Sequence, residues 1–138
     1  MRIPVIFKHL STILFSLVLL VLSLQVKAQT NYYVNDASLV GDVYTTAIGN
    51  NANAGTAASP YATITYVINT VGLVSGDTIF IDAGTFEQTD HTLTISVSDV
   101  HLVGAGSGLT LYDNNDNGTN EHFLKIRAND VTLTGIAI

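Results

Sequence analysis

One loop of this chain has the composition of a calcium site. The run Asp113-Asn114-Asn115-Asp116-Asn117-Gly118 places side-chain oxygens at loop positions 1, 3 and 5 and a glycine at position 6, which is typical of calcium loops. Those loops end on a glutamate at position 12, and here that position is Leu124. Asx-rich runs are also common turns, because their side chains hydrogen-bond to their own backbone. We therefore expect a turn, with calcium held by Asp113, Asn115 and Asn117 as the alternative, and no other cofactor.

The histidines beyond residue 28 could also bind a metal, but their spacing argues against it. His91, His101 and His122 are separated by 10 and 21 residues, which matches no local ligand motif. We expect them to be exposed and structurally indifferent rather than metal ligands. The tripeptide at 117–119 fits the N-glycosylation sequon, although so short a pattern often occurs by chance.

Aromatic side chains offer a different chemistry, the stacking of sugar rings. Tyr32, Tyr33, Tyr61 and Tyr66 lie in the first half of the chain that follows residue 28. We expect them mainly to pack around one another, and sugar stacking is the alternative. The chain contains no cysteine, so thiol catalysis, zinc–thiolate sites and redox roles are excluded.

The first 28 residues have the pattern of a cleavable signal peptide. Arg2, Lys8 and His9 form a basic start, and an apolar stretch follows over residues 10–26. Val26-Lys27-Ala28 then places suitable residues for cleavage after Ala28. A membrane anchor is the competing interpretation, but a span needs about 20 apolar residues, and this stretch is shorter and carries polar residues. We expect a secreted or cell-surface protein with no membrane partner after cleavage.

The net charge of the remaining chain argues against anionic partners. Beyond residue 28 the basic residues are Lys125 and Arg127, whereas all eleven acidic residues remain, which gives a formal net charge of −9. Such a chain repels phosphate backbones and anionic lipid surfaces. We therefore expect no nucleic acid among its partners.

Residues 29–75 read as a capping segment with one helix. The Asn- and Gly-rich run at 49–56 has turn composition. Ser59-Pro60 is a favoured helix start, and a helix over about 60–71 would place four apolar residues on one face. These residues are Ile64, Val67, Ile68 and Val71. Gly72 offers a place for that helix to end.

From residue 76 to 138 the hydrophobic period changes to two, and the strands repeat one another. Alternation predicts strands at 78–82, 92–98, 99–104 and 130–135, with inward pairs such as Ile79 and Ile81, then Val100 and Leu102. Residues 77–84 resemble 99–106 at an offset of 22, and 99–104 resemble 130–135 at an offset of 31. Repeats of this length indicate a solenoid. The unequal offsets favour a parallel β-helix in which residues 113–120 form a longer turn, and the 60–71 helix covers the first open edge.

Four segments carry a family resemblance. They are 59–64 (SPYATI), 76–86 (GDTIFIDAGTF), 103–106 (VGAG) and 131–136 (VTLTGI). With these segments the chain resembles the N-terminal region of right-handed parallel β-helix proteins of the pectate-lyase-like superfamily. The resemblance implies an amphipathic capping helix and a first coil at 76–86. It also implies a family of polysaccharide lyases, hydrolases, adhesins and surface proteins without known activity.

The resemblance assigns no catalytic residue here. Catalytic members carry acidic calcium ligands and a basic Arg or Lys on outward strands of middle coils. Lys125 and Arg127 lie in a strand that could present them outward, but no paired acidic cluster accompanies them.

The expectations are therefore as follows. The fold is all-β, a right-handed parallel β-helix with an N-terminal capping helix after a signal peptide. The function is a secreted or cell-surface scaffold that is glycan-associated or adhesive, with polysaccharides or cell-surface glycans as partners and no catalytic site evident in this fragment. A polysaccharide lyase or glycoside hydrolase with its active site in later coils is the alternative, and a bare structural stalk is the third. The apolar run that ends at Ile138 predicts further coils downstream and a marginally stable 29–138 fragment.

Overall fold

The structure, a computed structural model, describes residues 27–87, 93–113 and 124–138. These residues contain eight strands and one helix. The elements are β1 (Asn31–Val34), α2 (Ile64–Thr70), β2 (Thr78–Ile81), β3 (Gly84–Glu87), β4 (Leu93–Ile95), β5 (His101–Gly104), β6 (Thr110–Asp113), β7 (Leu124–Ile126) and β8 (Thr132–Thr134). No helix within these ranges has both the length and the apolar character needed to cross a membrane. Residues 1–26 of the predicted signal peptide lie outside the described residues.

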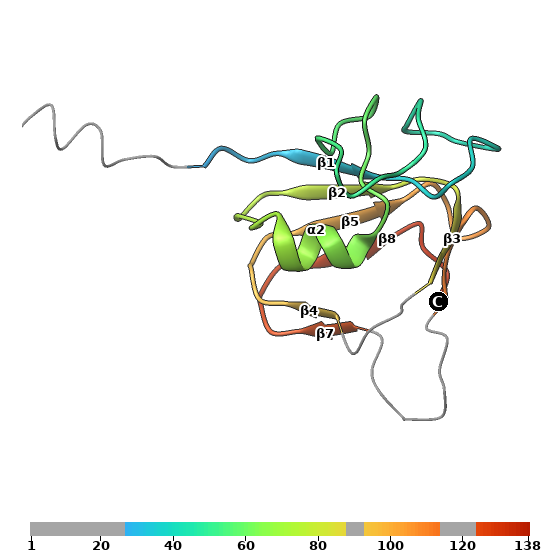
Figure 1. Cartoon of the computed structure of the whole chain (residues 1–138). Helices are drawn as coiled ribbons and strands as arrows, with labels where there is room; N and C mark the ends of the chain where they lie inside the picture. The colour runs from blue at the N-terminus through green and yellow to red at the C-terminus, as the bar shows by residue number, and fades with distance from the viewer. Residues whose placement is uncertain (1–26, 88–92, 114–123) are drawn as a thin grey trace, which may run out of the picture.

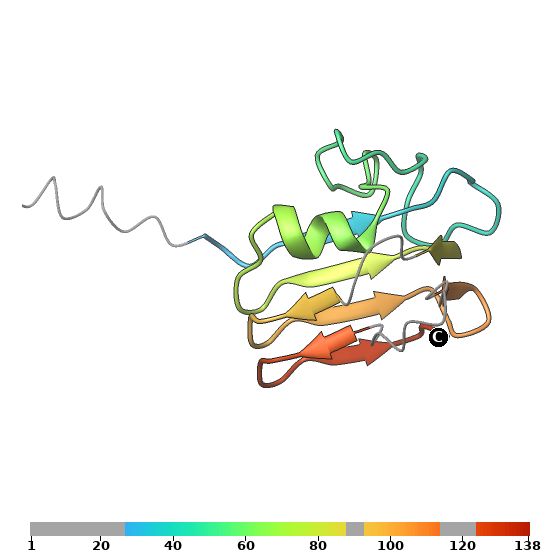
Figure 2. The same ribbon diagram turned by 60° about the horizontal axis from the view of Figure 1, so that its bottom comes forward.

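The strands form three parallel sheets, with the orders β1-β2-β5-β8, β3-β6 and β4-β7. The chain visits one strand of each sheet in turn, β2, β3 and β4, and then repeats the circuit with β5, β6 and β7. Each of these later strands pairs in parallel with the strand one circuit earlier. In Figure 1 α2 lies in front of the circuits, and Figure 2 shows the circuits stacked, with β1 and α2 at one end and the reddest strands, β7 and β8, at the other.

The register corrects one of the two predicted repeat offsets. β2 pairs with β5 through Thr78 and His101, an offset of 23 rather than 22, whereas the offset of 31 between β5 and β8 is confirmed. The reason is the core, because an offset of 22 would put His101 on the inward position of Ile79. The turn residue that matches Asp99 is therefore Gly76, not Asp77. Both have positive φ, 89° at Gly76 and 61° at Asp99.

The inward residues of the four-stranded sheet form columns, as alternation predicts. Tyr32, Ile79, Leu102 and Leu133 lie on successive strands in register. The first three are buried, whereas Leu133 on the outermost strand is only partly buried. Ile64 and Val67 of α2 join the same core. The hydrophobic core is thus continuous from the helix through the stacked strands, and its burial supplies the main stabilisation.

The helix begins later than predicted. Its N-cap is Thr63, whose hydroxyl accepts a hydrogen bond from the Tyr66 backbone N–H at 3.2 Å. Residues 60–62 are extended instead, because Tyr61 pairs with β1: its N–H donates to the Tyr33 carbonyl at 2.9 Å, and Asn35 N–H donates back to the Tyr61 carbonyl at 2.9 Å. The predicted end at Gly72 agrees with the structure, where the C-cap is Val71 and Gly72 has φ +74°.

Two strands were not predicted, and the four strands predicted by alternation are all shorter than predicted. β3 and β6 each contribute a single buried aromatic residue, Phe86 and Tyr112. The other inward position of β6 is the polar Thr110, so neither strand shows apolar alternation. β4 covers only residues 93–95 of the predicted 92–98.

Candidate functional site

The outer face of the four-stranded sheet carries two columns of side chains. The same alternation that buries Ile79 and Ile81 turns Thr78 and Phe80 outward. Because the strands pair in register, the outward residues align from strand to strand. One column contains Tyr33, Phe80, Val103 and Thr134, and the other contains Asn31, Thr78, His101 and Thr132. An aromatic–aliphatic column and a polar column therefore lie side by side.

The aromatic column begins with a ring stack. Tyr33 and Phe80 have ring centroids 5.2 Å apart and nearly parallel planes, at 17°. Tyr44, from the loop after β1, meets Phe80 edge-on at 5.1 Å and 62°. Its hydroxyl donates a hydrogen bond to the Gly104 carbonyl at 3.1 Å. All three rings are partly exposed. Together they form a cluster that combines apolar ring surface with two phenolic hydroxyls.

A buried carboxylate fixes the loop that supplies Tyr44. Asp82 is fully buried and accepts hydrogen bonds from the backbone N–H groups of Val43 at 2.6 Å, Tyr44 at 3.0 Å and Thr45 at 2.7 Å. The Thr45 hydroxyl adds a fourth at 2.8 Å. Burial alone would raise the pKa of Asp82, but the donors from Val43, Thr45 and Ala83 outweigh it and hold the pKa below its usual value. Asp82 is thus ionised and ties the loop to the end of β2.

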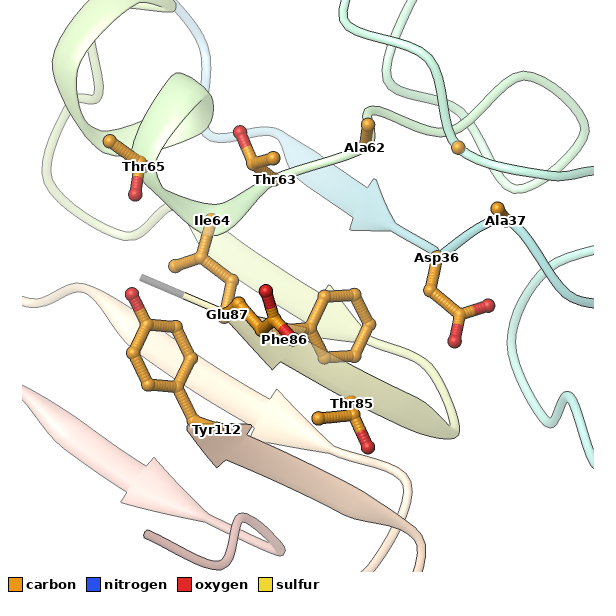
Figure 3. Close-up of a pocket in the computed structure, with 11 residues that line it drawn as sticks. Asp36, Ala37, Ala62, Thr63, Ile64, Thr65, Thr85, Phe86, Glu87 and Tyr112 are labelled. Carbon is orange, nitrogen blue, oxygen red and sulfur yellow. The ribbon is translucent and has the colours of Figure 1, made fainter. Parts of the chain in front are cut away.

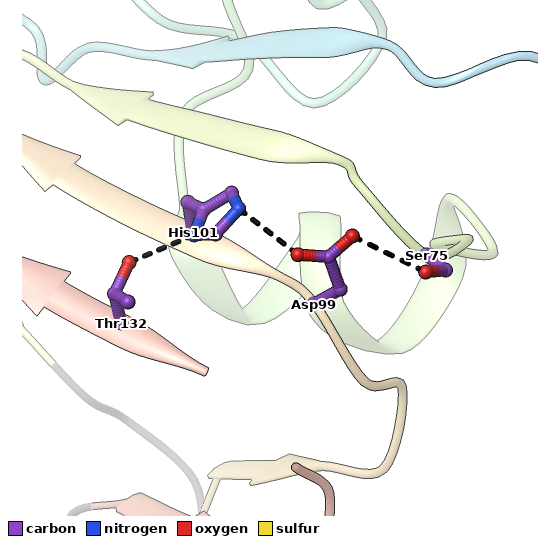
Figure 4. Close-up of polar contacts among 4 residues, drawn as sticks. All are labelled: Ser75, Asp99, His101 and Thr132. Carbon is purple, nitrogen blue, oxygen red and sulfur yellow. Dashed lines mark hydrogen bonds and ion pairs between the residues drawn. The ribbon is translucent and has the colours of Figure 1, made fainter. Parts of the chain in front are cut away.

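The polar column has its own hydrogen-bonded network, drawn in Figure 4. His101 Nδ1 lies 2.9 Å from Thr132 Oγ1, and its Nε2 lies 3.4 Å from Asp99 Oδ1. The other oxygen of Asp99 accepts a hydrogen bond from the Ser75 hydroxyl at 3.4 Å. These contacts fix the imidazole ring across the β5–β8 pair.

The order Thr132–His101–Asp99 matches the sequence nucleophile, base and orienting acid found in hydrolases. Catalysis would also need a shielded site with donors for a developing oxyanion. His101 and Asp99 instead have side-chain exposures of 34% and 52%. Neither residue lines either of two clefts beside α2, one that includes Thr63 and Tyr112 and one that includes Ile68 and Thr94. The network is therefore suited to hydrogen-bonding hydroxyl groups rather than to covalent chemistry.

A separate cleft of about 230 Å³ opens between the capping segment and the β3–β6 sheet. Figure 3 shows Asp36 and Thr63 on the capping side and Phe86, Glu87 and Tyr112 on the sheet side. Burial raises the pKa of Tyr112 to about 12, while a hydrogen bond with Thr65 acts against it. Its phenol is therefore protonated at neutral pH. Asp36 Oδ1 accepts a hydrogen bond from Ser38 N–H at 2.6 Å.

Of the three candidate calcium ligands, only Asp113 lies within the described residues. Asp113 is exposed at the end of β6 and lies opposite Glu87 in the register of the β3–β6 pair. Asn115 and Asn117 lie outside the described residues. Within the described ranges, no group of three or more His, Cys, Asp or Glu residues is arranged to hold a metal.

The structure describes only some of the other residues that the sequence analysis considered. Lys125 in β7 and Arg127 just after it are exposed, as expected. His91, His122 and the sequon at 117–119 lie outside the described residues. His101 is described, and the expectation that it is indifferent was wrong because it joins the network with Asp99 and Thr132.

The tyrosines divide into two groups. Tyr32 and Tyr61 are buried, and Tyr66 packs against Tyr61 at 5.2 Å, which confirms the packing role. Tyr33 belongs to the outer face. Phe80 was missed, although its place between inward Ile79 and Ile81 marks it as an outward aromatic residue. No local signal identified Tyr44, because a loop places it there.

Comparison with known proteins provides no further identification. No protein-family model, curated protein or solved structure matches this chain.

Proposed function

We propose that this chain is the cap and opening coils of an exported right-handed parallel β-helix of the pectate-lyase-like type, which serves as a glycan-binding surface scaffold. The repeated circuits β2-β3-β4 and β5-β6-β7, with parallel pairing at each step, support the solenoid architecture. The capping segment supports it as well, because its residues 55–61 hydrogen-bond along β1 and cover that edge.

The glycan proposal rests on the pairing of the two outer columns. A sugar ring has an apolar C–H face and a rim of hydroxyls, so it needs a flat apolar surface beside fixed hydrogen-bonding groups. Tyr33, Phe80 and Tyr44 contribute partly exposed apolar ring surface on this face. The His101–Thr132 pair provides the fixed hydrogen-bonding groups; it lies on the following strands of the same sheet, β5 and β8, in the column two positions earlier in the register. Stacked strands lie about 4.8 Å apart, so both columns extend in the direction of stacking and favour a chain-like ligand.

Charge narrows the class of glycan. The formal charge of −9 beyond residue 28 opposes anionic polysaccharides at low ionic strength. Beside the polar column, Asp99 adds a carboxylate 3.4 Å from His101 Nε2. We therefore expect neutral polysaccharides as ligands, with further coils of the same architecture to extend the surface.

The test is binding by the exported full chain, with a soluble neutral β-glucan and polygalacturonate as probes in isothermal titration calorimetry. Tyr33→Ala and Phe80→Ala should each weaken β-glucan binding by roughly tenfold or more, because each removes one ring of the stack. Tyr66→Ala is the matched control, since it removes a partly exposed ring on α2, away from this face, and should leave affinity unchanged.

The outcomes separate the proposal from its rivals. Binding by both aromatic variants at unchanged affinity would overturn the assignment to this face. If neither the β-glucan nor polygalacturonate binds, the result would favour a structural stalk. New reducing ends or unsaturated products in the same incubations would favour a lyase or hydrolase.

A further inference from the structure

The boundary of the predicted signal peptide lies directly before the first strand. Residues 27–29 are exposed, so the Ala28–Gln29 peptide bond is accessible at the surface. Cleavage there makes Gln29 the first residue of the exported protein. Lys27, which donates to the Gly72 carbonyl at 2.6 Å and lies over the Tyr32 ring, leaves with the signal peptide.

The chain is anchored immediately after this point. Thr30 N–H donates to Asp77 Oδ1 at 2.7 Å, and the Thr30 carbonyl accepts from Thr78 N–H at 3.1 Å. Asp77 is fully buried. These bonds hold residue 30 at the start of β1, and they leave Gln29 as a single exposed residue in front of a fixed anchor.

The side chain of Gln29 lies on the surface over a glycine. A Cβ placed on Gly76 would lie 3.0 Å from Gln29 Cδ and 3.1 Å from its Oε1. The carboxamide thus sits over the Gly76 backbone and is not enclosed by the core. After cleavage, the new α-amine and this carboxamide would belong to the same exposed residue.

We propose that Gln29 becomes a pyroglutamate residue in the exported protein; this rests on the export and the cleavage after Ala28 proposed above. The α-amine attacks Cδ of its own side chain, the N–Cδ bond forms, the Cδ–Nε2 bond breaks, and ammonia leaves with a proton from the amine. No oxidant or reductant is required. The product is a five-membered lactam without a charge at the N-terminus.

The anchor is compatible with this ring. Cyclisation uses the α-nitrogen and the side chain, and it leaves the Gln29 α-carbonyl and the Thr30 N–H that donates to Asp77 untouched. The modified terminus therefore keeps the attachment of β1. It also lacks the free α-amine that an aminopeptidase needs, which would protect the strand that begins at Asn31 from trimming at its exposed end.

The test is mass spectrometry of the full chain after export by a bacterial host, followed by incubation with purified glutaminyl cyclase. We expect an N-terminal peptide that starts at residue 29, is lighter by one ammonia and resists Edman degradation. Gln29→Asn is the matched control, because its shorter side chain would have to close a four-membered ring. It should start at the same residue with a free amine.

The outcomes distinguish this proposal from the one it rests on. A peptide that starts at residue 29 with an intact carboxamide and a free amine after incubation would overturn the modification alone. A product that retains the first 28 residues, or starts at another residue, would overturn the predicted cleavage and the modification with it.

Discussion

At the scale of single residues, Asp82 has the largest concentration of hydrogen bonds in the described loops that flank the outer face. Replacing it by Asn keeps its shape but turns one acceptor into a donor that opposes the N–H groups of the 43–45 loop. We expect Asp82→Asn to lower the free energy of unfolding by about 2–4 kcal/mol, because buried donors lose their partner. Urea denaturation of the purified chain measures this.

The control for that substitution is Asp99→Asn. Asp99 is exposed and has φ +61°, a conformation that Asn tolerates well, so the change should stay within about 0.5 kcal/mol. Equal losses in the two variants would contradict the role of Asp82.

Asp82 also sets a pH dependence. Its folded-state pKa lies below its unfolded value, so its ionised form stabilises the fold fully above the unfolded pKa. That stabilisation is lost as the pH falls through the folded-state pKa. Denaturation midpoints should therefore fall on acidification below about pH 4, and this part of the decline should be absent in Asp82→Asn. An identical acid profile in both proteins would count against it.

At the scale of elements, Gly104 at the end of β5 and Gly108 in the loop that follows should respond differently to substitution. A Cβ on Gly104 would clash with the Gly135 carbonyl oxygen and lie 2.7 Å from Ile136 Cγ1, whereas a Cβ on Gly108 would meet nothing within 4 Å. We expect Gly104→Ala to cost about 1–3 kcal/mol by forcing β5 and β8 apart, and Gly108→Ala to be neutral. Thermal unfolding of both variants decides, and tolerance of Gly104→Ala would refute the close approach of these strands.

Sequence patterns predicted some of these elements and missed others. Alternation identified β2, β5 and β8, because each places aliphatic residues on its inward side at period two. It failed for β3 and β6, where Thr110 holds an inward position through hydrogen bonds to the carbonyls of Ile81 and Asp82. Capping signals placed the helix start at Ser59-Pro60, but pairing of Tyr61 with β1 moved it to Thr63. Local propensity cannot report such long-range competition.

The candidate site was predictable only in part for the same reason. Tyr33 was recognised as an aromatic residue that could stack on sugar, but its neighbour Phe80 is 47 positions away and Tyr44 depends on the Asp82 anchor. The His101 network needed the register of β5 and β8. Contacts between side chains on neighbouring strands can be recognised only once the register of those strands is known.

At the scale of the whole molecule, the two ends of the stack differ in how well they are covered. The β1 end is paired by residues 55–61 and packed by α2. At the other end, β8 pairs with β5 and, among the described residues, no strand pairs with its second edge. Ile126 and Ile138 expose 46% and 70% of their surface there. An uncovered edge with apolar side chains favours association with another edge.

We therefore expect the chain that begins at Gln29 to self-associate as its concentration rises, because stacked repeats gain stability from their neighbours. Ile126→Lys should shift sedimentation velocity profiles towards the monomer by placing a charge at that end. Val40→Lys is the matched control, since Val40 is 86% exposed in the capping segment and the same charge there should leave association unchanged. A chain that is monomeric at every concentration would show that the uncovered β7–β8 end is stable without a partner. Equal shifts in both variants would show that self-association does not use the β7–β8 end.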